Sequence, residues 1–322
     1  MSAPFEFILE WENALLSDVD RARAMLRELQ QQARTYADAE KTSFDLRVMY
    51  DSDEIDVSVP QSVVDETIDR DIWPGEVRFV AAPGLEYYEQ KNLGVEQSEA
   101  SIIIFIDSDV IPQPGWLAAL LSPLDDHSVK FVCGNTYQAT DTEFDKISAL
   151  FWKFDVKCEE SGLDEVKAFY ANNLAMRREH ALKYPFPRQP TFRNQCSKLA
   201  RTMLENGECI YNARDAWVSH PPVSGVSHFF QQAICQGHDS LISNRQRANG
   251  LVRANPLASA FRLVRGLVQA PTRILRRNAK LGLGGLTVLK ALLLSFVYQL
   301  LLFVGEVMAF VSPKFVRKRF NV

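Results

Sequence analysis

Two carboxylates, Asp107 and Asp109, stand either side of Ser108 and directly follow an apolar run at residues 102–106. Such a run is typical of a strand buried on both faces, and ligands of open α/β sheets bind at the carboxyl ends of the strands. Alternate residues of an extended chain face the same side, so both carboxylates are expected at one site. Because they repel each other unless a cation lies between them, the pair predicts a divalent ion that holds a diphosphate. Taken alone, the motif is equally compatible with a simple turn.

Acidic residues also follow two earlier strand-like runs. Glu12 comes shortly after the run at residues 5–9, and Asp51 directly follows the run from Phe44 to Tyr50. Both runs are short and rich in aliphatic and aromatic residues, as strands are. If these strands are parallel, their carboxyl ends share one edge of the sheet. We therefore expect these acids to converge with the pair described above.

Strand and helix patterns alternate through the first 135 residues. Strands are expected at residues 5–9, 44–50, 77–82, 102–106 and 130–134, and helices fill most of the intervals between them. Alternation of this kind predicts an α/β fold with a mostly parallel, doubly wound, Rossmann-like sheet and flanking helices.

Length and composition allow one large α/β domain with an appendage, since the chain has 322 residues of ordinary globular composition. Its five cysteines show no C-x-x-C spacing, so the sequence indicates neither a zinc site nor a disulfide framework. The first residues lack a basic region followed by an apolar core, which predicts no signal peptide and a cytoplasmic catalytic domain.

The C-terminal part has a different character. Residues 261–322 carry a net charge of +10, while the whole chain carries −4. A basic, apolar tail on an acidic globule points to an anionic membrane surface and not to nucleic acid.

Residues 256–285 are expected to form a basic amphipathic interfacial segment. Residues 286–322 are expected to form an apolar, membrane-inserted helix with a basic end, in which residues 291–311 could cross the ~30 Å hydrocarbon layer. A buried core helix is the alternative. The sequence is therefore predicted to consist of an α/β domain at residues 1–255, the interfacial segment at 256–285 and the apolar helix with its basic end at 286–322.

Four segments, in this order, resemble the family-2 glycosyltransferases with the GT-A nucleotide-sugar-binding fold, in particular their membrane-associated bacterial type. They are Gln90-Lys91-Asn92-Leu93-Gly94 together with the Asp-x-Asp strand and its following Pro-Gly-Trp, then residues 172–179, residues 205–220 with a strand at 208–212, and residues 229–239. The resemblance covers roughly residues 5–239.

This resemblance implies an inverting, single-displacement hexosyltransferase of polysaccharide biosynthesis. Its implied cofactor is Mn²⁺ or Mg²⁺, its donor a nucleotide-diphosphate sugar, and its acceptor a lipid-linked or saccharide molecule. The implied donor-binding residues are Glu12, Asp51, Lys91, Asp107 and Asn173; the implied metal ligands are Asp109 and His220; and the implied acceptor-side residues are Gln232 and His238. The plainer alternatives are a solvated helix lysine for Lys91 and a turn histidine for His220.

One departure from the family pattern concerns the general base. The family usually carries Glu-Asp at the start of its late helix, where the Asp is the base, but those places hold Gln195 and Cys196. An amide accepts no proton usefully, and a thiol is a poor substitute for a carboxylate. The catalytic residue is therefore unknown. Either the alignment is shifted, or another acid acts, or the acceptor is already anionic, as a lipid phosphate is.

Two other functions compete with an active transferase. A catalytically degenerate GT-A module would bind a nucleotide sugar or a partner at the membrane without turnover, which the missing base favours. The apolar strand with Asp-x-Asp also resembles the nucleophile loop of haloacid-dehalogenase-type phosphatases. In those enzymes the loop lies near the N-terminus, whereas here several strands precede it.

Overall fold

The computed structural model describes residues 3–16, 18–158, 160–189, 191–222, 225–247 and 256–319. The chain forms two compact units. Unit 1 comprises Met1–Tyr137, Glu159–Arg188 and Gln195–Pro221, and unit 2 comprises Gln138–Cys158, Gln189–Asn194 and Pro222–Val322. The predicted divisions at residues 255 and 285 do not coincide with the limits of these units, and they stay a prediction about functional segments.

Unit 1 is built on one mixed sheet with the strand order β3-β2-β1-β4-β8-β6-β9-β5, and β7 pairs with β9. Strands β3, β2, β1 and β4 run parallel, whereas β8 pairs antiparallel with both β4 and β6. The bounds are β1 Phe5–Glu10, β2 Phe44–Tyr50, β3 Val77–Ala81, β4 Ile102–Asp107, β5 Ile111–Pro112, β6 Phe131–Gln138, β7 Leu163–Glu165, β8 Asn173–Arg177 and β9 Tyr211–His220.

The α/β class predicted from the sequence is confirmed, with two differences in detail. The sheet is parallel only in its N-terminal half, because the later strands return antiparallel across β4. The last long strand, β9, begins at Tyr211 and continues to His220, whereas the sequence indicated a strand at residues 208–212.

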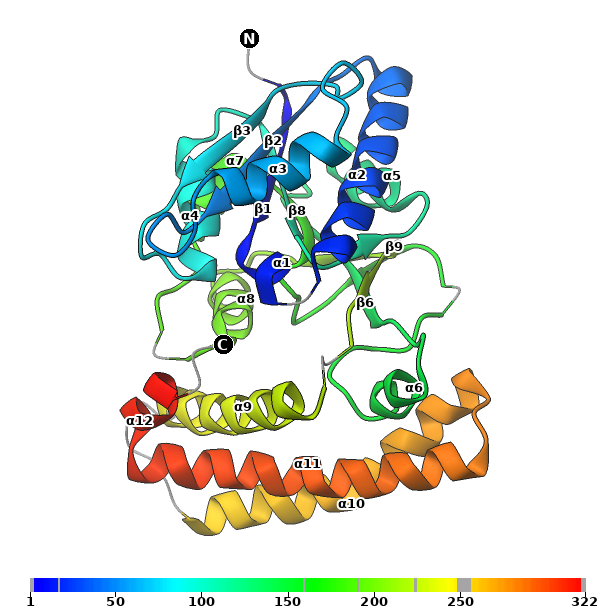
Figure 1. Cartoon of the computed structure of the whole chain (residues 1–322), viewed down its shortest axis with the longest axis vertical. Helices are drawn as coiled ribbons and strands as arrows, with labels where there is room; N and C mark the ends of the chain where they lie inside the picture. The colour runs from blue at the N-terminus through cyan, green and yellow to red at the C-terminus, as the bar shows by residue number, and fades with distance from the viewer. Residues whose placement is uncertain are drawn as a thin grey trace. The chain divides into compact units, whose positions relative to one another are not determined.

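Helices cover both faces of this sheet (Figure 1). Apolar side chains of α2, α3 and α5 pack with one face, and those of α4, α7 and α8 pack with the other. Helix α2 shows why: its buried positions Ala22, Met25, Leu26 and Leu29 recur at helical spacing, and Asp18 caps its first turn. The bounds in unit 1 are α1 Glu12–Leu16, α2 Val19–Glu40, α3 Ser58–Thr67, α4 Tyr87–Gln97, α5 Trp116–Leu121, a 3-10 turn Ser122–Asp125, α7 Arg178–Lys183 and α8 Gln195–Glu205.

The register of the central strands sets the position of the acids. Glu10 of β1 lies opposite Asp107 of β4, so both strands end at the same level. Gly94 brings α4 close to β1, since a Cβ at that position would lie 2.8 Å from a methyl carbon of Ile8. This close packing places α4, which carries Lys91, beside the end of β4.

Unit 2 is helical and has its own core. An aromatic cluster of Phe151, Trp152, Phe229 and Tyr298 joins segments that are far apart in the sequence. Its helices are α6 Glu143–Ala149, α9 Gly225–Arg247, α10 Pro256–Leu281, α11 Gly285–Val311 and α12 Pro313–Arg319. By length and composition α11 could cross a membrane, the single such helix among the residues that the structure describes.

Candidate active site

Asp107 is the centre of a buried polar cluster at the end of β4. Its Oδ1 accepts hydrogen bonds from the Lys91 ammonium at 2.9 Å and from the Tyr87 hydroxyl at 2.5 Å. Its Oδ2 accepts a hydrogen bond from the Asn13 side chain at 3.3 Å. Both donors on Oδ1 come from one face of α4, because residues four apart on a helix lie above one another. The carboxylate is therefore held in one orientation by α4 and α1.

Lys91 is fully buried, so the solvated-lysine alternative is wrong. Its ammonium lies 4.6 Å from the ring centroid of Tyr87 and 5.5 Å from that of Phe105, in addition to its ion pair with Asp107. A buried cation is costly unless it is paired and hydrogen-bonded. Lys91 therefore supplies the positive charge that pairs with the Asp107 carboxylate in the interior.

Glu10, and not Glu12, is the acid that accompanies Asp107. Glu10 is fully buried at the last position of β1, and Asn13 donates to its Oε1 at 2.7 Å. Burial, followed by repulsion from Asp107, raises the pKa of Glu10 well above its ordinary value, and Lys91 offsets only part of this. Glu12 belongs to α1 and is half-buried. The sequence did not single out Glu10, because an acid at the end of an apolar strand pattern usually marks the point where the strand reaches the surface.

Asp109 and His220, the metal ligands that the family resemblance implies, lie close together, and their binding of an ion stays a prediction. The distance between Asp109 Oδ2 and His220 Nε2 is 3.9 Å. His220 Nδ1 lies 2.7 Å from the carbonyl oxygen of Pro221, which fits the tautomer that donates from Nδ1 and leaves the Nε2 lone pair toward Asp109. The short antiparallel pairing of β5 with β9, which aligns Ile111 with Ser219, brings the two side chains together.

Arg21 of α2 fixes this arrangement from outside. Its Nε donates to the backbone oxygen of Asp109 at 2.5 Å, and its Nη2 donates to the Ser219 backbone oxygen at 2.7 Å and hydroxyl at 2.9 Å. One guanidinium thus ties the residue before His220 to the loop that carries Asp109. Sequence patterns gave no sign of this role, because Arg21 lies 88 positions from Asp109.

A divalent ion fits these residues only in part. Within the described parts of the chain, no group of three or more His, Cys, Asp or Glu side chains gathers as a complete metal site. Asp109 and His220 together offer one carboxylate and one imidazole, which suit a hard or borderline ion with oxygen ligands from elsewhere. Such a pair could hold an ion only together with ligands from another molecule, such as the oxygens of an anion.

Asp51 and Asn173 have other partners. Asp51 Oδ1 accepts from the backbone N–H groups of Asp53 and Gly84, each at 2.9 Å, which joins the end of β2 to the loop after β3. The Asn173 amide is fully buried: it donates to the backbone oxygens of Asn135 and Ala216 and accepts from the Trp116 indole at 2.8 Å. Asn173 thus holds the sheet together, and its contact with a donor sugar stays a prediction.

Cys196 lies buried in the first turn of α8, with its sulfur 3.4 Å from the Tyr88 hydroxyl. Burial raises the pKa of the Cys196 thiol to about 11. The group therefore stays protonated at neutral pH and takes up no proton from an acceptor. Gln195, buried beside it, offers an amide.

The raised pKa predicts slow chemical modification of Cys196. Because thiolate is the reactive form, iodoacetamide at pH 8 should leave Cys196 intact in the folded protein and alkylate it after denaturation. The exposed Cys209 serves as the internal control, since it should react in the folded state. Peptide mass spectrometry measures both. Equal alkylation of the two cysteines in the folded protein would contradict this description of the Cys196 environment.

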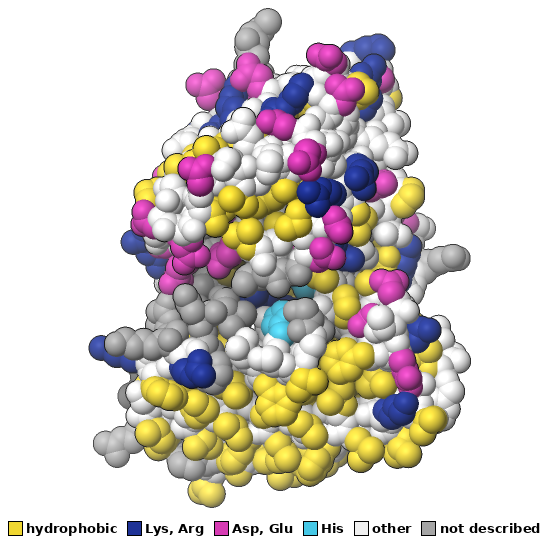
Figure 2. Space-filling view, viewed as in Figure 1, with side chains coloured by type: hydrophobic (Ala, Val, Ile, Leu, Met, Phe, Trp, Pro, Cys, Tyr) yellow, Lys and Arg dark blue, Asp and Glu magenta, His cyan; other side chains and the backbone are white. Residues whose placement is uncertain are grey.

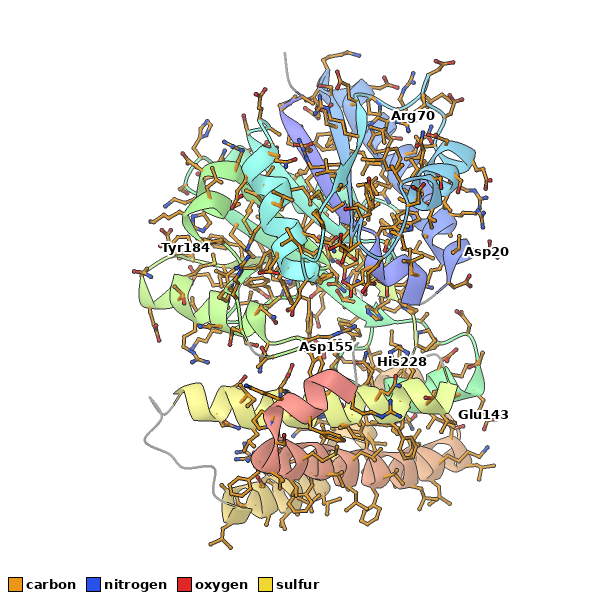
Figure 3. All side chains as sticks on the ribbon, turned by 60° about the vertical axis from the view of Figure 1, so that its left-hand side comes forward. Asp20, Arg70, Glu143, Asp155, Tyr184 and His228 are labelled. Carbon is orange, nitrogen blue, oxygen red and sulfur yellow. The ribbon has the colours of Figure 1, made fainter. Side chains whose placement is uncertain are left out.

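The predicted acceptor-side residues belong to α9 in unit 2. Gln232 is hydrogen-bonded to His228, which is labelled in Figure 3, with 2.9 Å between their side-chain nitrogens. His238 is fully buried, and its Nδ1 lies 3.0 Å from Asp239 Oδ1. Asp239 in turn accepts from the backbone N–H groups of Phe192 and Arg193. Their role toward an acceptor stays a prediction.

Comparison with known proteins bears on the fold and on the central segment. Residues 61–184 match the model of a family described as Glycosyl transferase family 2. The matched segment contains α4, β4 and both Asp107 and Asp109. The chain carries a family 2 glycosyltransferase segment. A solved structure of a mannosyltransferase from Pyrobaculum calidifontis, in complex with GDP-mannose and Mn²⁺, resembles the chain with a TM-score of 0.58 at 14% identity. The similarity covers 96% of this chain and 87% of that one.

These similarities confirm the GT-A fold for the family 2 glycosyltransferase segment and its surroundings, which leaves no place for the phosphatase alternative. A second structure, GalNAc-T7 with UDP, GalNAc and Mn²⁺, has a TM-score of 0.45 at 12% identity and covers 69% of this chain and 44% of that one. No curated protein matches the chain.

Proposed function

We propose that the chain is a metal-dependent, membrane-associated glycosyltransferase that moves a sugar from a nucleotide-diphosphate donor to a lipid-linked or saccharide acceptor with inversion. The observation that carries this proposal is the pair Asp109, two residues after the end of β4, and His220, the last residue of β9, which lie 3.9 Å apart. Asp109 also follows Asp107, which pairs with the buried Lys91. That donor set suits a divalent ion shared with a diphosphate. The resemblance to a mannosyltransferase bound to GDP-mannose and Mn²⁺ supports the same assignment.

Each group has a part in this proposal. Asp109 and His220 would hold Mn²⁺ or Mg²⁺, and the ion would neutralise the charge that develops on the departing diphosphate. Arg21 keeps both side chains in position through its contacts with the Asp109 and Ser219 backbones. Asp107 and Lys91 fix the end of β4 against α4. Asp51, at the end of β2, would contact the nucleotide base.

The acceptor follows from the missing base. Because Cys196 stays a thiol at neutral pH, a neutral sugar hydroxyl would lack the help that a general base gives, typically worth about 10²–10⁴-fold in rate. A phosphate monoester is largely ionised near pH 7, since its second pKa is about 6. It could attack the anomeric carbon without a base. A lipid phosphate is therefore the acceptor that this site favours, and a degenerate, non-catalytic module is the alternative.

Turnover assays with two acceptors separate these possibilities. Release of nucleoside diphosphate from a panel of nucleotide sugars should be faster with a polyprenyl phosphate than with an oligosaccharide, and it should require Mn²⁺ or Mg²⁺. Cys196→Ala should change the polyprenyl phosphate reaction little. If Cys196→Asp instead creates large activity toward the oligosaccharide, the lipid-phosphate assignment is wrong. No turnover with any donor and acceptor, despite nucleotide binding, would favour the degenerate module.

A further inference from the structure

Helix α11 has two different sides along its whole length. Its buried residues recur at helical spacing and form one stripe: Ala291, Ser295, Tyr298, Gly305, Glu306 and Ala309. Its exposed large apolar residues form the opposite stripe: Leu286, Leu289, Leu293, Phe296, Val297, Leu300, Val304, Val307, Phe310 and Val311. The buried stripe consists mostly of small or polar residues, and the exposed stripe consists of large apolar ones. Helix α11 thus packs into unit 2 with one side and leaves an apolar side exposed.

Three side chains of α11 with polar groups bind neighbouring helices of unit 2. Glu306 accepts from the Arg262 guanidinium of α10 at 2.8 and 2.6 Å and from the Ser240 hydroxyl of α9 at 3.1 Å. Tyr298 donates to Gln236 of α9. Near the start of α11, Lys290 pairs with Glu143 of α6, and Glu143 is labelled in Figure 3. The Glu306 carboxylate, which would be costly against lipid, is thus neutralised by a neighbouring helix.

Glycines bring the backbones of α9 and α11 into contact. A Cβ on Gly237 of α9 would lie 2.1 Å from the Leu302 backbone oxygen, and one on Gly305 of α11 would lie 2.1 Å from that of Ile234. Helix α11 therefore lies beside α9 and also packs against α10 (Figure 1). The three helices form one layer, so α11 cannot take up a different orientation in a membrane from its neighbours without breaking these contacts.

Helix α10 carries a second exposed apolar stripe with basic residues beside it. Leu257, Phe261, Val264, Val268 and Leu275 are exposed at spacings that place them on one face. Arg265, Arg273, Arg276 and Lys280 are also exposed, along the middle and end of the same helix. A spanning orientation of the layer would carry these arginines into hydrocarbon, where charged side chains are costly.

We propose that the exposed apolar stripes of α10 and α11, here called the membrane face, lie flat in the interface of an anionic lipid bilayer and that α11 does not cross it. Figure 2 shows hydrophobic side chains gathered over α11. Each helix is about 40 Å long at 1.5 Å per residue, and long exposed apolar surfaces mark sites of interaction with proteins or membranes. The basic side chains of α10 complement anionic headgroups. This inference does not depend on the proposed transferase activity.

Depth measurements distinguish a flat helix from a spanning one. Leu289, Leu300 and Val311 share the exposed stripe and stand 11 residues apart, about 16 Å along the axis. Each is replaced by a cysteine carrying a fluorophore, in the full chain with Cys158 and Cys209 changed to serine. Quenching by brominated lipids at several acyl positions then gives the depth of each label. Three equal, shallow depths are expected. A label at position 300 near the bilayer centre, with the other two near its surfaces, would overturn the proposal.

Vesicle binding tests the charge and the apolar face separately, without nucleotide. Binding of the full chain to phosphatidylcholine vesicles should strengthen when phosphatidylglycerol is added. The triple change R265Q/R273Q/R276Q should weaken binding to the mixed vesicles at least tenfold, and the double change L293Q/F296Q should do the same. The matched control is R27Q/R34Q/R70Q, exposed arginines of unit 1 (Arg70 is labelled in Figure 3), which should bind as the unchanged protein does.

Two results would contradict the membrane face. Equal losses in the α10 variant and the unit 1 control would mean that net charge alone drives binding. A stable dimer in lipid-free solution, dissociated by L293Q/F296Q, would mean that a second copy of the chain covers the face. Circular dichroism of each variant confirms that its helices are retained, and exposed positions were chosen for that reason.

Discussion

Replacing Asp109 with alanine is expected to lower the Mn²⁺-dependent affinity for a nucleoside diphosphate by more than about 100-fold, since even outer partners of metal ligands cost roughly 10- to 100-fold when removed. Asp109 is buried 3.9 Å from His220, and in the proposed function the two would hold the ion that the diphosphate shares. Titration monitored by tryptophan fluorescence measures the affinity with and without Mn²⁺.

The control for this change is Asp126→Ala, because Asp126 is an exposed acid of unit 1 that belongs to a different loop. It should bind the nucleotide as the unchanged protein does. If the Asp109→Ala variant melts at the same temperature as the unchanged protein, its loss of nucleotide affinity is local and does not come from unfolding. Affinity within about twofold of the unchanged protein, in the presence of Mn²⁺, would remove Asp109 from the metal site.

Replacing Lys91 with methionine should destabilise the protein by about 3–5 kcal/mol, because it leaves the buried Asp107 carboxylate without its cation. The double variant with Asp107→Asn should recover at least half of that loss, since neither charge then remains unpaired. Urea unfolding gives each free energy.

Lys130→Met is the matched control for Lys91→Met. Lys130 also pairs with an acid, Glu208 at 3.1 Å, but its side chain is 44% exposed, so its loss should cost less than about 1 kcal/mol. Equal destabilisation by the two lysine changes would show that the Lys91–Asp107 pair has no special place in the fold.

The central strand and its aspartates were predictable because the signal is local. An apolar run that ends in two carboxylates identifies a buried strand and its ligand-binding end, and the structure places Asp107 at the last position of β4. Lys91 was found for a different reason, through the family motif that contains it. Its complete burial could not be read from the sequence, since a lysine on a helix is usually solvated.

The remaining parts of the site depend on contacts between distant segments. Glu10 was missed because it is the last residue of β1, two positions before Glu12, and nothing in the local sequence marks it as a buried acid. Arg21 and Tyr87 act through hydrogen bonds to Asp109 and Asp107, which only the packing of α2 and α4 establishes. The two-sided character of α11 also escaped prediction, because its polar residues are few and their partners lie on α9 and α10.

Calorimetric titration of GDP and UDP into the unchanged full chain tests the central claim most directly, with Mn²⁺ present and then with the ion removed by a chelator. If Asp109 and His220 hold an ion shared with a diphosphate, at least one nucleotide should bind with Mn²⁺ and lose most of its binding heat without it. Binding of equal strength in both conditions, or no binding of either nucleotide with Mn²⁺, would contradict the assignment of this site.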